Sequence, residues 1–315
     1  MKKILLVILA ITSIRAAAQT GSRDFKAIDE YIKGLGAMEG MSTATINNVV
    51  INHFEDKIDK ARAIYTWIAM NITYDVKAAR TNSTMKNTPA DVLLYRRAVG
   101  AGFAALFQDM CSIAGIRCLT VDGFVKTSIE QIGEKGTDIN HTWAVVQLGQ
   151  SPDTWYYVDP AWGSGYADAE MKTFTRSFTG AYFFADKAAF NLQHYPDNEA
   201  WKLGPGPRSK KDFYGLPLVK VAALEFDMKR FTPNDGKLKA KVDKPVYFTY
   251  VIGGRDEISK VSLAIGERKK YKLKEVDFAY AGGSLSFSYK FEEGSFPVTV
   301  LVNGRELMTY SVEVD

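Results

Sequence analysis

The sequence predicts an α+β protein whose helices and antiparallel strands form a first domain, followed by a domain of short strands alone. Three observations lead to this prediction. Apolar residues recur at helical spacing between residues 56 and 115, alternate like strands between 116 and 160, and fall into many short runs after residue 216. A chain of 315 residues is also long enough for two domains.

Two helices are predicted in the first domain. Residues 56–70 carry apolar side chains at helical spacing, with Asp56 and Asp59 in the first turn, which indicates an amphipathic helix. Residues 76–95 form a loop with a turn of helix at "PADVLLY". The second helix begins near Gly100, is apolar around much of its circumference and therefore buried, and ends at Gly115.

Three strands follow, at residues 116–126, 141–148 and 154–160, and the loop "GQSPDT" joins the last two as a hairpin. Residues 161–215 are mixed and rich in aromatic residues. They end in "GPGPRSKKD", which we interpret as a linker. The first domain accordingly spans residues 20–215.

Residues 216–315 predict an immunoglobulin-like β-sandwich. Gly, Asp and Asn residues divide this region into about eight short strands, and "VNGR" at residues 302–305 is a strong signal for a two-residue hairpin turn. The runs expected to form strands are "KVAALEFDM", "KLKAKV", "PVYFTYVI", "KVSLAIG", "KKYKLKEVDFAY", "GSLSFSYKF", "FPVTVLVNG" and "RELMTYSVEV".

The first 19 residues have the layout of a secretory signal peptide. Lys2 and Lys3 precede an apolar stretch that is too short for a membrane span, and the small residues Ala16 to Ala18 offer a cleavage site. We therefore expect an exported protein, periplasmic or secreted, with no integral membrane segment after signal removal.

Charge and cysteine content limit the classes of partner. Removal of Lys2, Lys3 and Arg15 with the signal leaves 37 basic and 36 acidic residues, a net charge of +1. A nearly neutral protein gives no electrostatic reason to expect a nucleic acid partner. Cys111 and Cys118 form either one bridge or two buried thiols, and the sequence leaves both open.

Three histidines occur: His53, His141 and His194. None lies at zinc-ligand spacing from another histidine or from the cysteines, so we expect no metal and no other cofactor. His141 opens one predicted strand and Asp159 closes the neighbouring one, where an aspartate can hold an imidazole in one tautomer. The alternative is a histidine packed beneath Trp143 and Trp162 without a catalytic role.

Several motifs in order resemble the transglutaminase-like superfamily, in the branch related to the kyphoscoliosis peptidase. They are "ARAIYTWIAMNITYD", "RRAVGAGFAALFQDMCSIAGI", "NHTWAVV" and "WYYVDPAWG", within residues 55–165, followed by "FFADKAAFNLQHYPDNEAWKL" at 183–203. The resemblance implies a papain-like core with a cysteine nucleophile at the start of a buried helix. It also implies that His141 is the base and Asp159 the acid that orients it.

The nucleophile position of this family coincides with Gly100, within "AVGAGF". The resemblance therefore implies a retained dyad of His141 and Asp159 beside a lost thiol. Cys111 lies eleven residues further along the helix, about 16 Å away along its axis. Nothing in the sequence directs Cys118 toward His141.

Three functions remain open. The first is an inactive relative that binds a peptide, protein or peptidoglycan-like ligand in the space left by the thiol, through Gly100, Ala101, Gly102, Trp143 and Trp162. The second is an active hydrolase or acyltransferase with an atypical nucleophile. The third is a binding protein that acts through its β-sandwich, with the first domain as a scaffold.

Overall fold

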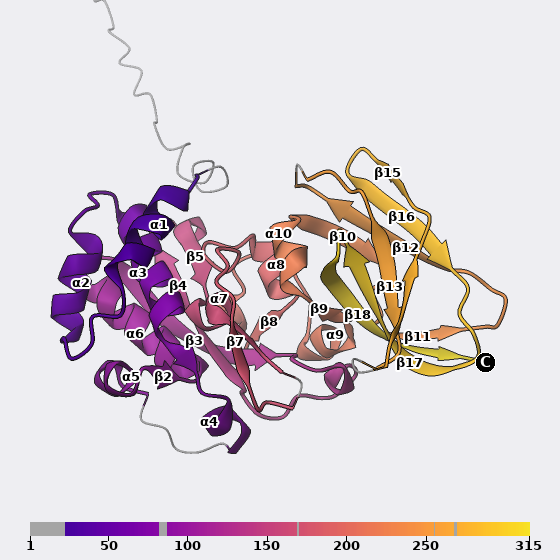
Figure 1. The fold of residues 1–315 in the computed structure, drawn as a ribbon, viewed down its shortest axis with the longest axis horizontal. Coiled ribbons are helices and arrows are strands. Elements are labelled where there is room, and N and C mark those ends of the chain that lie inside the picture. Colours follow the sequence, from indigo (N-terminus) through magenta and orange to yellow (C-terminus); the bar gives the residue numbers. More distant parts are fainter. Residues whose placement is uncertain (1–22, 82–86, 169, 255, 268–269) are drawn as a thin grey trace, which may run out of the picture.

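The computed structural model describes residues 23–81, 87–168, 170–254, 256–267 and 270–315. The predicted signal peptide at residues 1–19 lies outside this part of the chain. Helices and a four-stranded sheet form the half that begins at α1, and two strand-rich layers form the other half, which ends at the C-terminus (Figure 1). The predicted α+β class is confirmed.

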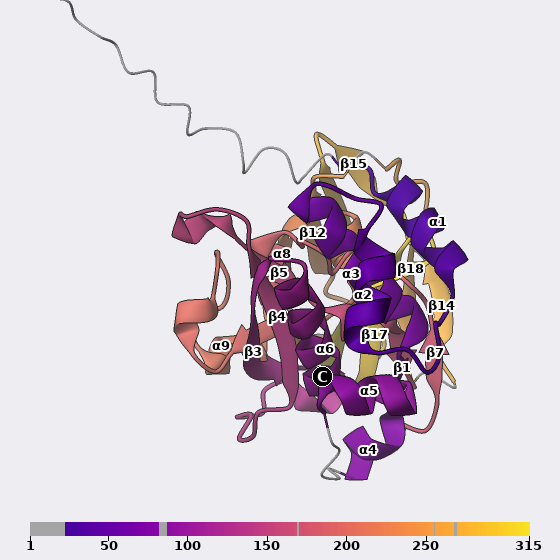
Figure 2. The same ribbon diagram turned by 90° about the vertical axis from the view of Figure 1, so that its left-hand side faces the viewer.

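Six helices come first along the described chain, and α6 lies directly over the sheet that contains β3 and β4 (Figure 2). The sequence analysis did not foresee α1, α2 and α4. The six are α1 (Lys26–Leu35), α2 (Thr43–Ile51), α3 (Lys57–Asn71), α4 (Val76–Thr81), α5 (Pro89–Tyr95) and α6 (Gly100–Ile113).

Helix α3 starts where its sequence predicts, because the Asp56 carboxylate accepts the amides of Ile58 and Asp59 and caps the helix. Its predicted amphipathic character is wrong. Every residue from Ala61 to Ala69 is buried, since α1, α2, α6 and α7 pack around the helix. Even Arg62 is enclosed there, with its guanidinium bound to the Asp29 carboxylate at 2.7 and 2.9 Å.

The first domain's sheet is antiparallel, with the strand order β5-β4-β3-β8. The predicted hairpin between β4 and β5 is present, and Ala144 pairs with Val158. The fourth strand comes from the segment we had described only as mixed. The strands are β3 (Arg117–Val125), β4 (His141–Gln147), β5 (Trp155–Val158) and β8 (His194–Pro196).

Short elements complete this half of the molecule. Two small sheets pair β1 with β2 and β6 with β7. The bounds are β1 (Thr73–Tyr74), β2 (Arg97–Ala98), η1 (Ile129–Gln131), η2 (Pro152–Thr154), α7 (Pro160–Ser164), β6 (Gly165–Ala167), β7 (Phe174–Arg176), α8 (Lys187–Asn191), η3 (Glu199–Trp201) and α9 (Lys210–Gly215).

The C-terminal half consists of two sheets that share one hydrophobic core. One sheet has the order β10-β12-β16-β15, and the other β11-β18-β17-β13-β14, with β9 paired to β18. The elements are β9 (Leu218–Val219), α10 (Val221–Glu225), β10 (Met228–Thr232), β11 (Lys237–Ala240), β12 (Val246–Ile252), β13 (Val261–Ile265), β14 (Lys272–Glu275), β15 (Ala279–Ala281), β16 (Ser284–Tyr289), β17 (Gly294–Val302) and β18 (Arg305–Val314).

This arrangement is a β-sandwich, and its immunoglobulin-like type stays a prediction. Asn303 and Gly304 both have positive φ between β17 and β18, so the predicted two-residue turn is confirmed. Two strand predictions are wrong. Most of "KVAALEFDM" is helix α10, and "KKYKLKEVDFAY" contains two strands, β14 and β15.

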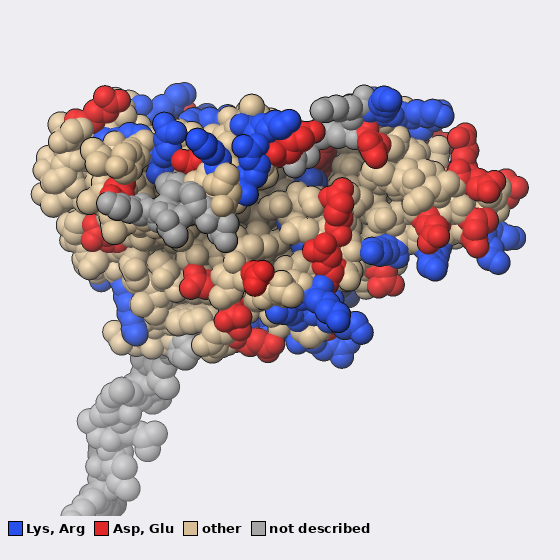
Figure 3. Space-filling view, turned by 90° about the horizontal axis from the view of Figure 1, so that it is seen from below, with Lys and Arg blue, Asp and Glu red and all other residues tan. Residues whose placement is uncertain are grey.

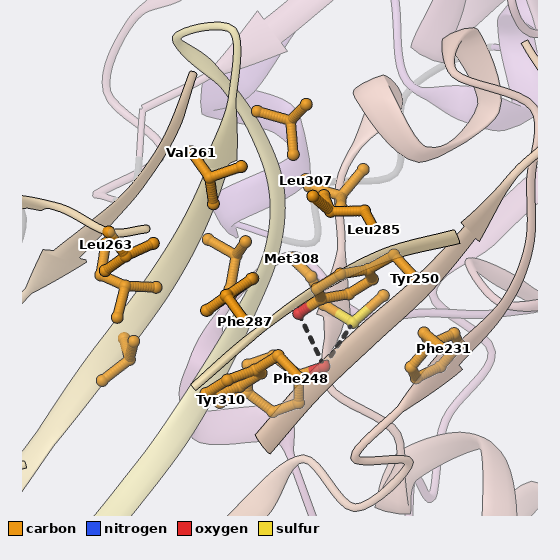
Figure 4. Packing of buried hydrophobic residues seen from close by; sticks show 14 of the residues in the cluster. Phe231, Phe248, Tyr250, Val261, Leu263, Leu285, Phe287, Leu307, Met308 and Tyr310 are labelled. Atoms are coloured by element: carbon orange, nitrogen blue, oxygen red, sulfur yellow. Dashed lines mark hydrogen bonds between the residues drawn. The ribbon is translucent and has the colours of Figure 1, made fainter. Parts of the chain in front are cut away.

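The core of the sandwich is almost entirely apolar. Phe248 stacks on Phe287 with ring centroids 4.9 Å apart, and the Tyr250 and Tyr310 hydroxyls meet at 3.3 Å (Figure 4). The Tyr310 hydroxyl also donates toward the Met308 sulfur at 3.1 Å (Figure 4). These phenols satisfy one another without a charged group.

The segment predicted as a linker is partly folded, because Asn191 donates to the carbonyls of Gly204 and Pro205 at 3.0 and 2.9 Å and helix α9 begins at Lys210. Phe213 and Tyr214 of α9 are buried against Phe124. The ammonium of Lys126, at the end of β3, donates to the carbonyls of Phe213 and Leu216 at 2.5 and 2.7 Å. These contacts join β3 to the chain that enters the sandwich.

The surface seen from below in Figure 3 carries basic and acidic side chains side by side across both halves. This mixture agrees with the near balance of charges in the sequence. Among the described residues, no helix is both long and apolar enough to span a membrane.

Candidate functional site

The predicted site residues come from three elements that the fold brings together. Gly100 is the first residue of α6, His141 is the first residue of β4, and Asp159 follows β5 and caps α7. Helix α6 packs against both β3 and β4, so its N-terminus lies beside the start of β4.

His141 and Asp159 are in direct contact. The Nε2 atom of His141 lies 2.7 Å from Oδ2 of Asp159, and both residues are buried. The other carboxylate oxygen of Asp159 accepts the amides of Ala161 and Trp162, each at 3.0 Å. Because the helix cap fixes Oδ1, Oδ2 is held toward the imidazole.

A second histidine joins this pair. His194 of β8 places its Nε2 atom 3.0 Å from the same Oδ2 atom of Asp159, and it is completely buried. The sequence analysis counted His194 but gave it no role. The only available signal was its position in "LQHYP", within the segment similar to the kyphoscoliosis branch. Pairing of β8 with β3, with His194 opposite Val125, brings it to the site.

The carboxyl of Asp159 is strongly perturbed. Burial by itself raises its pKa, but the neighbouring imidazoles of His141 and His194 outweigh burial and hold the pKa well below its usual range. Asp159 is therefore ionised at neutral pH, and it accepts hydrogen bonds through both oxygens.

The pKa of His194 is lowered, whereas a carboxylate beside an exposed histidine would raise it. Complete burial lowers its pKa to about 4, although the hydrogen bond to Asp159 partly offsets this effect. The ring is thus neutral at pH 7 and donates its Nε2 proton to the carboxylate. Its Nδ1 atom is then buried without a hydrogen-bond partner of acceptable geometry among the described residues.

Gly100 lies against the imidazole of His141. A Cβ atom added at Gly100 would be 2.5 Å from Nδ1 and 2.7 Å from Cε1 of His141, and 3.1 Å from the Thr142 carbonyl oxygen. The expectation that a missing thiol leaves open space is therefore wrong. The imidazole ring occupies the volume that a side chain at position 100 would need.

The residues predicted to bind a ligand differ in exposure. Gly100, Gly102 and Trp143 are buried, whereas Ala101 and Trp162 are partly exposed. Trp143 and Trp162 both lie near the His141 ring, at centroid distances of 6.2 and 5.8 Å. Of these five residues, only Ala101 and Trp162 are accessible to solvent to a larger extent.

Neither cysteine is near His141. Cys118 pairs with Val146 in the register that pairs Gly123 with His141, so it lies five residues away along β3, about 17 Å at strand spacing. Cys111 is buried on α6, with its pKa raised by burial and by its contact with Cys118. In the structure both are free thiols.

Histidine spacing along the chain led us to expect no metal, but the folded cluster brings three potential ligands together. The donor atoms of His141, Asp159 and His194 all lie within 4.8 Å of one another. They converge from β4, the end of β5 and β8, an arrangement that spacing along the chain does not reveal.

A cavity of about 790 Å³ lies elsewhere, between α1, α3 and the segment around Phe178.

Comparisons with known proteins indicate the family of the part of the chain that contains this site. The family model of the transglutaminase-like superfamily matches residues 44–160, which contain Gly100, His141 and Asp159. Residues 44–160 thus form a domain of the transglutaminase-like superfamily.

The chain is also similar to kyphoscoliosis peptidases. The human kyphoscoliosis peptidase is 29% identical over 252 residues, which cover 76% of this chain and 37% of the relative. The mouse protein is 31% identical over 217 residues, which cover 65% of this chain and 32% of the relative. The chain thus spans about a third of the length of these curated relatives.

A solved transglutaminase structure is also similar, at 17% identity. It covers 51% of this chain and 38% of its own, with a TM-score of 0.30.

Proposed function

We propose that this transglutaminase-like protein is exported and has no thiol-based catalysis, and that it binds a peptide- or glycopeptide-like ligand at the edge of the His141 site. The observation that carries this proposal is Gly100, which stands at the start of α6 against the imidazole of His141. In this family position 100 is where the resemblance requires a nucleophilic cysteine.

Loss of the thiol removes the attacking group. In a well-studied triad, removal of the nucleophile costs about six orders of magnitude in turnover. No described cysteine replaces it, because Cys111 and Cys118 lie more than about 15 Å along their elements from the site. Acyl transfer through a thioester is therefore not expected.

Binding at this site is supported by the N-terminus of α6. The carbonyl of Val99 accepts the amides of Gly102 and Phe103, and Val99 has no side-chain cap to offer. The amides of Gly100 and Ala101 have no acceptor among the described residues. Backbone amides at the positive end of a helix suit a ligand carbonyl or carboxylate.

A partly exposed aromatic ring lies near the His141 imidazole. Trp162 follows the Asp159 cap and lies 5.8 Å from the His141 ring, so it can pack against an apolar or sugar portion of a ligand. The backbone amide of Ala101 is a polar group and the ring of Trp162 is an apolar surface at this edge. Such a combination is typical of peptide and glycopeptide sites.

Activity is tested by hydrolysis and amine-transfer assays on glutamine- and lysine-containing peptides. We expect no turnover by the wild type that iodoacetamide abolishes. Gly100→Cys tests whether position 100 can hold a reactive thiol. An introduced thiol that displaces the His141 ring should be alkylated faster than Cys111 or Cys118. Turnover by the wild type that iodoacetamide blocks would disprove the proposal.

Binding is tested by titration of the same peptides, and of soluble peptidoglycan fragments, into the full chain with chelator present. Trp162→Ala should weaken binding, whereas the matched variant Trp201→Ala should not. Trp201 packs on Trp155 at a centroid distance of 5.3 Å, and no ring contact joins it to His141 or Trp162 among the described residues. Equal loss of affinity in both variants would exclude the His141 edge as the binding site.

A further inference from the structure

We propose that His141, His194 and Asp159 bind a divalent transition-metal ion, with Zn²⁺ as the reference ion and solvent as the fourth ligand. The ligand atoms are Nε2 of each histidine and Oδ2 of the aspartate. This site goes beyond the proposed peptide binding, and neither the family resemblance nor the relatives' names assign it.

The donor atoms already converge. Both Nε2 atoms lie within 3.0 Å of Oδ2 of Asp159, and the three donors lie within 4.8 Å of one another. In a tetrahedral zinc site with bonds of about 2.0–2.1 Å, neighbouring ligand atoms are about 3.3 Å apart. Entry of an ion thus requires the two contacts with Oδ2 to lengthen by about 0.3–0.6 Å, and the most separated donor pair, up to 4.8 Å apart, to approach by up to about 1.5 Å.

The donor types also fit. Two imidazoles and one carboxylate, with a fourth position left to solvent, form a common ligand set for zinc. Among the described residues, these are the three histidine, cysteine or acidic side chains that come close enough together to hold an ion. The carboxylate is fixed for one-oxygen ligation, because the Ala161 and Trp162 amides hold its other oxygen.

An unpaired buried atom supports the metal-bound arrangement. Without an ion, His194 donates its Nε2 proton to Asp159, and Nδ1 is left as a buried acceptor with no partner among the described residues. A buried acceptor without a hydrogen bond destabilises the fold. When Nε2 binds a metal, the proton moves to Nδ1, where the backbone of Phe190 favours it.

The cluster is least enclosed at His141. Asp159 and His194 are completely buried, whereas His141 keeps 6% of its surface exposed. Trp143 and Phe190 pack against His194, with centroid distances of 5.2 and 3.9 Å. The proposal therefore places the entry of the ion and its solvent ligand on the His141 side of the cluster.

The test is equilibrium dialysis of the full, untagged chain against Zn²⁺ after removal of metals by a chelator. We expect one ion per chain. His194→Gln keeps a donor for Asp159 but removes a zinc ligand, so it should fold and lose affinity by more than the 10–100-fold typical of outer-shell changes. His141→Gln should behave alike.

The third histidine provides the matched control. His53 stacks on Tyr31 at 4.6 Å, away from the cluster, so His53→Gln should bind Zn²⁺ as the wild type does. Substitution of Co²⁺ gives a readout that needs no variant, because tetrahedral ligation produces a strong visible absorption band.

Three results would overturn the proposal: no ion bound by the wild type, unchanged affinity in His194→Gln, or weak octahedral-type absorption with Co²⁺. Peptide binding is measured separately in chelator, so the metal site and the peptide site can fail independently.

Discussion

The two halves of the molecule bury polar groups in different ways. In the first domain an ionised carboxylate, Asp159, lies at the centre of a buried cluster and accepts four hydrogen bonds from four residues. Among the described residues of the sandwich no charged side chain is buried; the buried polar groups are hydroxyls, and those of Tyr250 and Tyr310 pair with each other.

This difference separates a site from a scaffold. A buried charge is tolerated only when converging partners compensate it, and removal of one partner leaves the rest unpaired. A pair of neutral hydroxyls adds little beyond what apolar packing already provides. We therefore expect polar changes to be costly in the first domain and mild in the sandwich.

The largest effect is expected from Asp159→Ala. This change removes the acceptor of two imidazoles and of two helix amides, and we expect a loss of about 3–5 kcal/mol in the free energy of unfolding. Urea denaturation measures it. Asp235→Ala, at an exposed loop residue, is the control and should change stability by less than about 0.5 kcal/mol. Equal effects of the two changes would remove the distinction between the halves.

Acid pH should produce the next largest effect. His194 stays neutral in the folded chain down to a pKa of about 4, whereas in the unfolded chain it takes up a proton near its ordinary value of 6.5. Stability should therefore fall as pH drops from 6.5 to 4, by about 3 kcal/mol. Below that range, protonation of Asp159, whose pKa is lowered in the fold, continues the loss.

Urea denaturation between pH 7 and pH 4, with chelator present, measures this dependence. His194→Gln should flatten it, and Tyr250→Phe in the sandwich should leave its slope unchanged. A slope that persists in His194→Gln would assign the effect to other groups.

A smaller effect is expected from Gly100→Ala. The added Cβ meets the His141 ring at 2.5 Å, so we expect a destabilisation of about 1–3 kcal/mol. Gly34 in α1 is the matched control, because a Cβ there has no neighbour within 4 Å. Gly34→Ala should stabilise the protein by about 0.4–1 kcal/mol. Thermal unfolding of both variants tests whether the His141 ring really occupies the space at position 100.

The smallest effect is expected from Tyr250→Phe. It removes one hydroxyl from a pair 3.3 Å apart, while the Tyr310 hydroxyl keeps the Pro233 carbonyl at 3.2 Å as a partner. We expect a loss of no more than about 1 kcal/mol by urea denaturation. A loss as large as that of Asp159→Ala would mean that the sandwich core depends on its polar pair.

The sequence by itself determined several local elements of this protein, although not α1, α2, α4 or α10. Helix α3 begins after Asp56, the Asn303-Gly304 turn joins the last two strands, and β4 and β5 form a hairpin. Each depends on residues that are close in the chain, where capping, turn chemistry and periodicity act directly. The hairpin also showed that His141 and Asp159 can lie on adjacent strands, and the family resemblance implied that they act as a pair.

Only the tertiary structure decided what surrounds that pair. His194 lies on β8, 53 residues beyond the first residue of β4. No local sequence pattern distinguishes a histidine that can bind a metal from one that only packs in the core. The His141 ring fills the space at Gly100 because α6 packs onto β4, which no spacing rule encodes. Burial and convergence are sums of many distant contacts, so they appear only once the chain has folded.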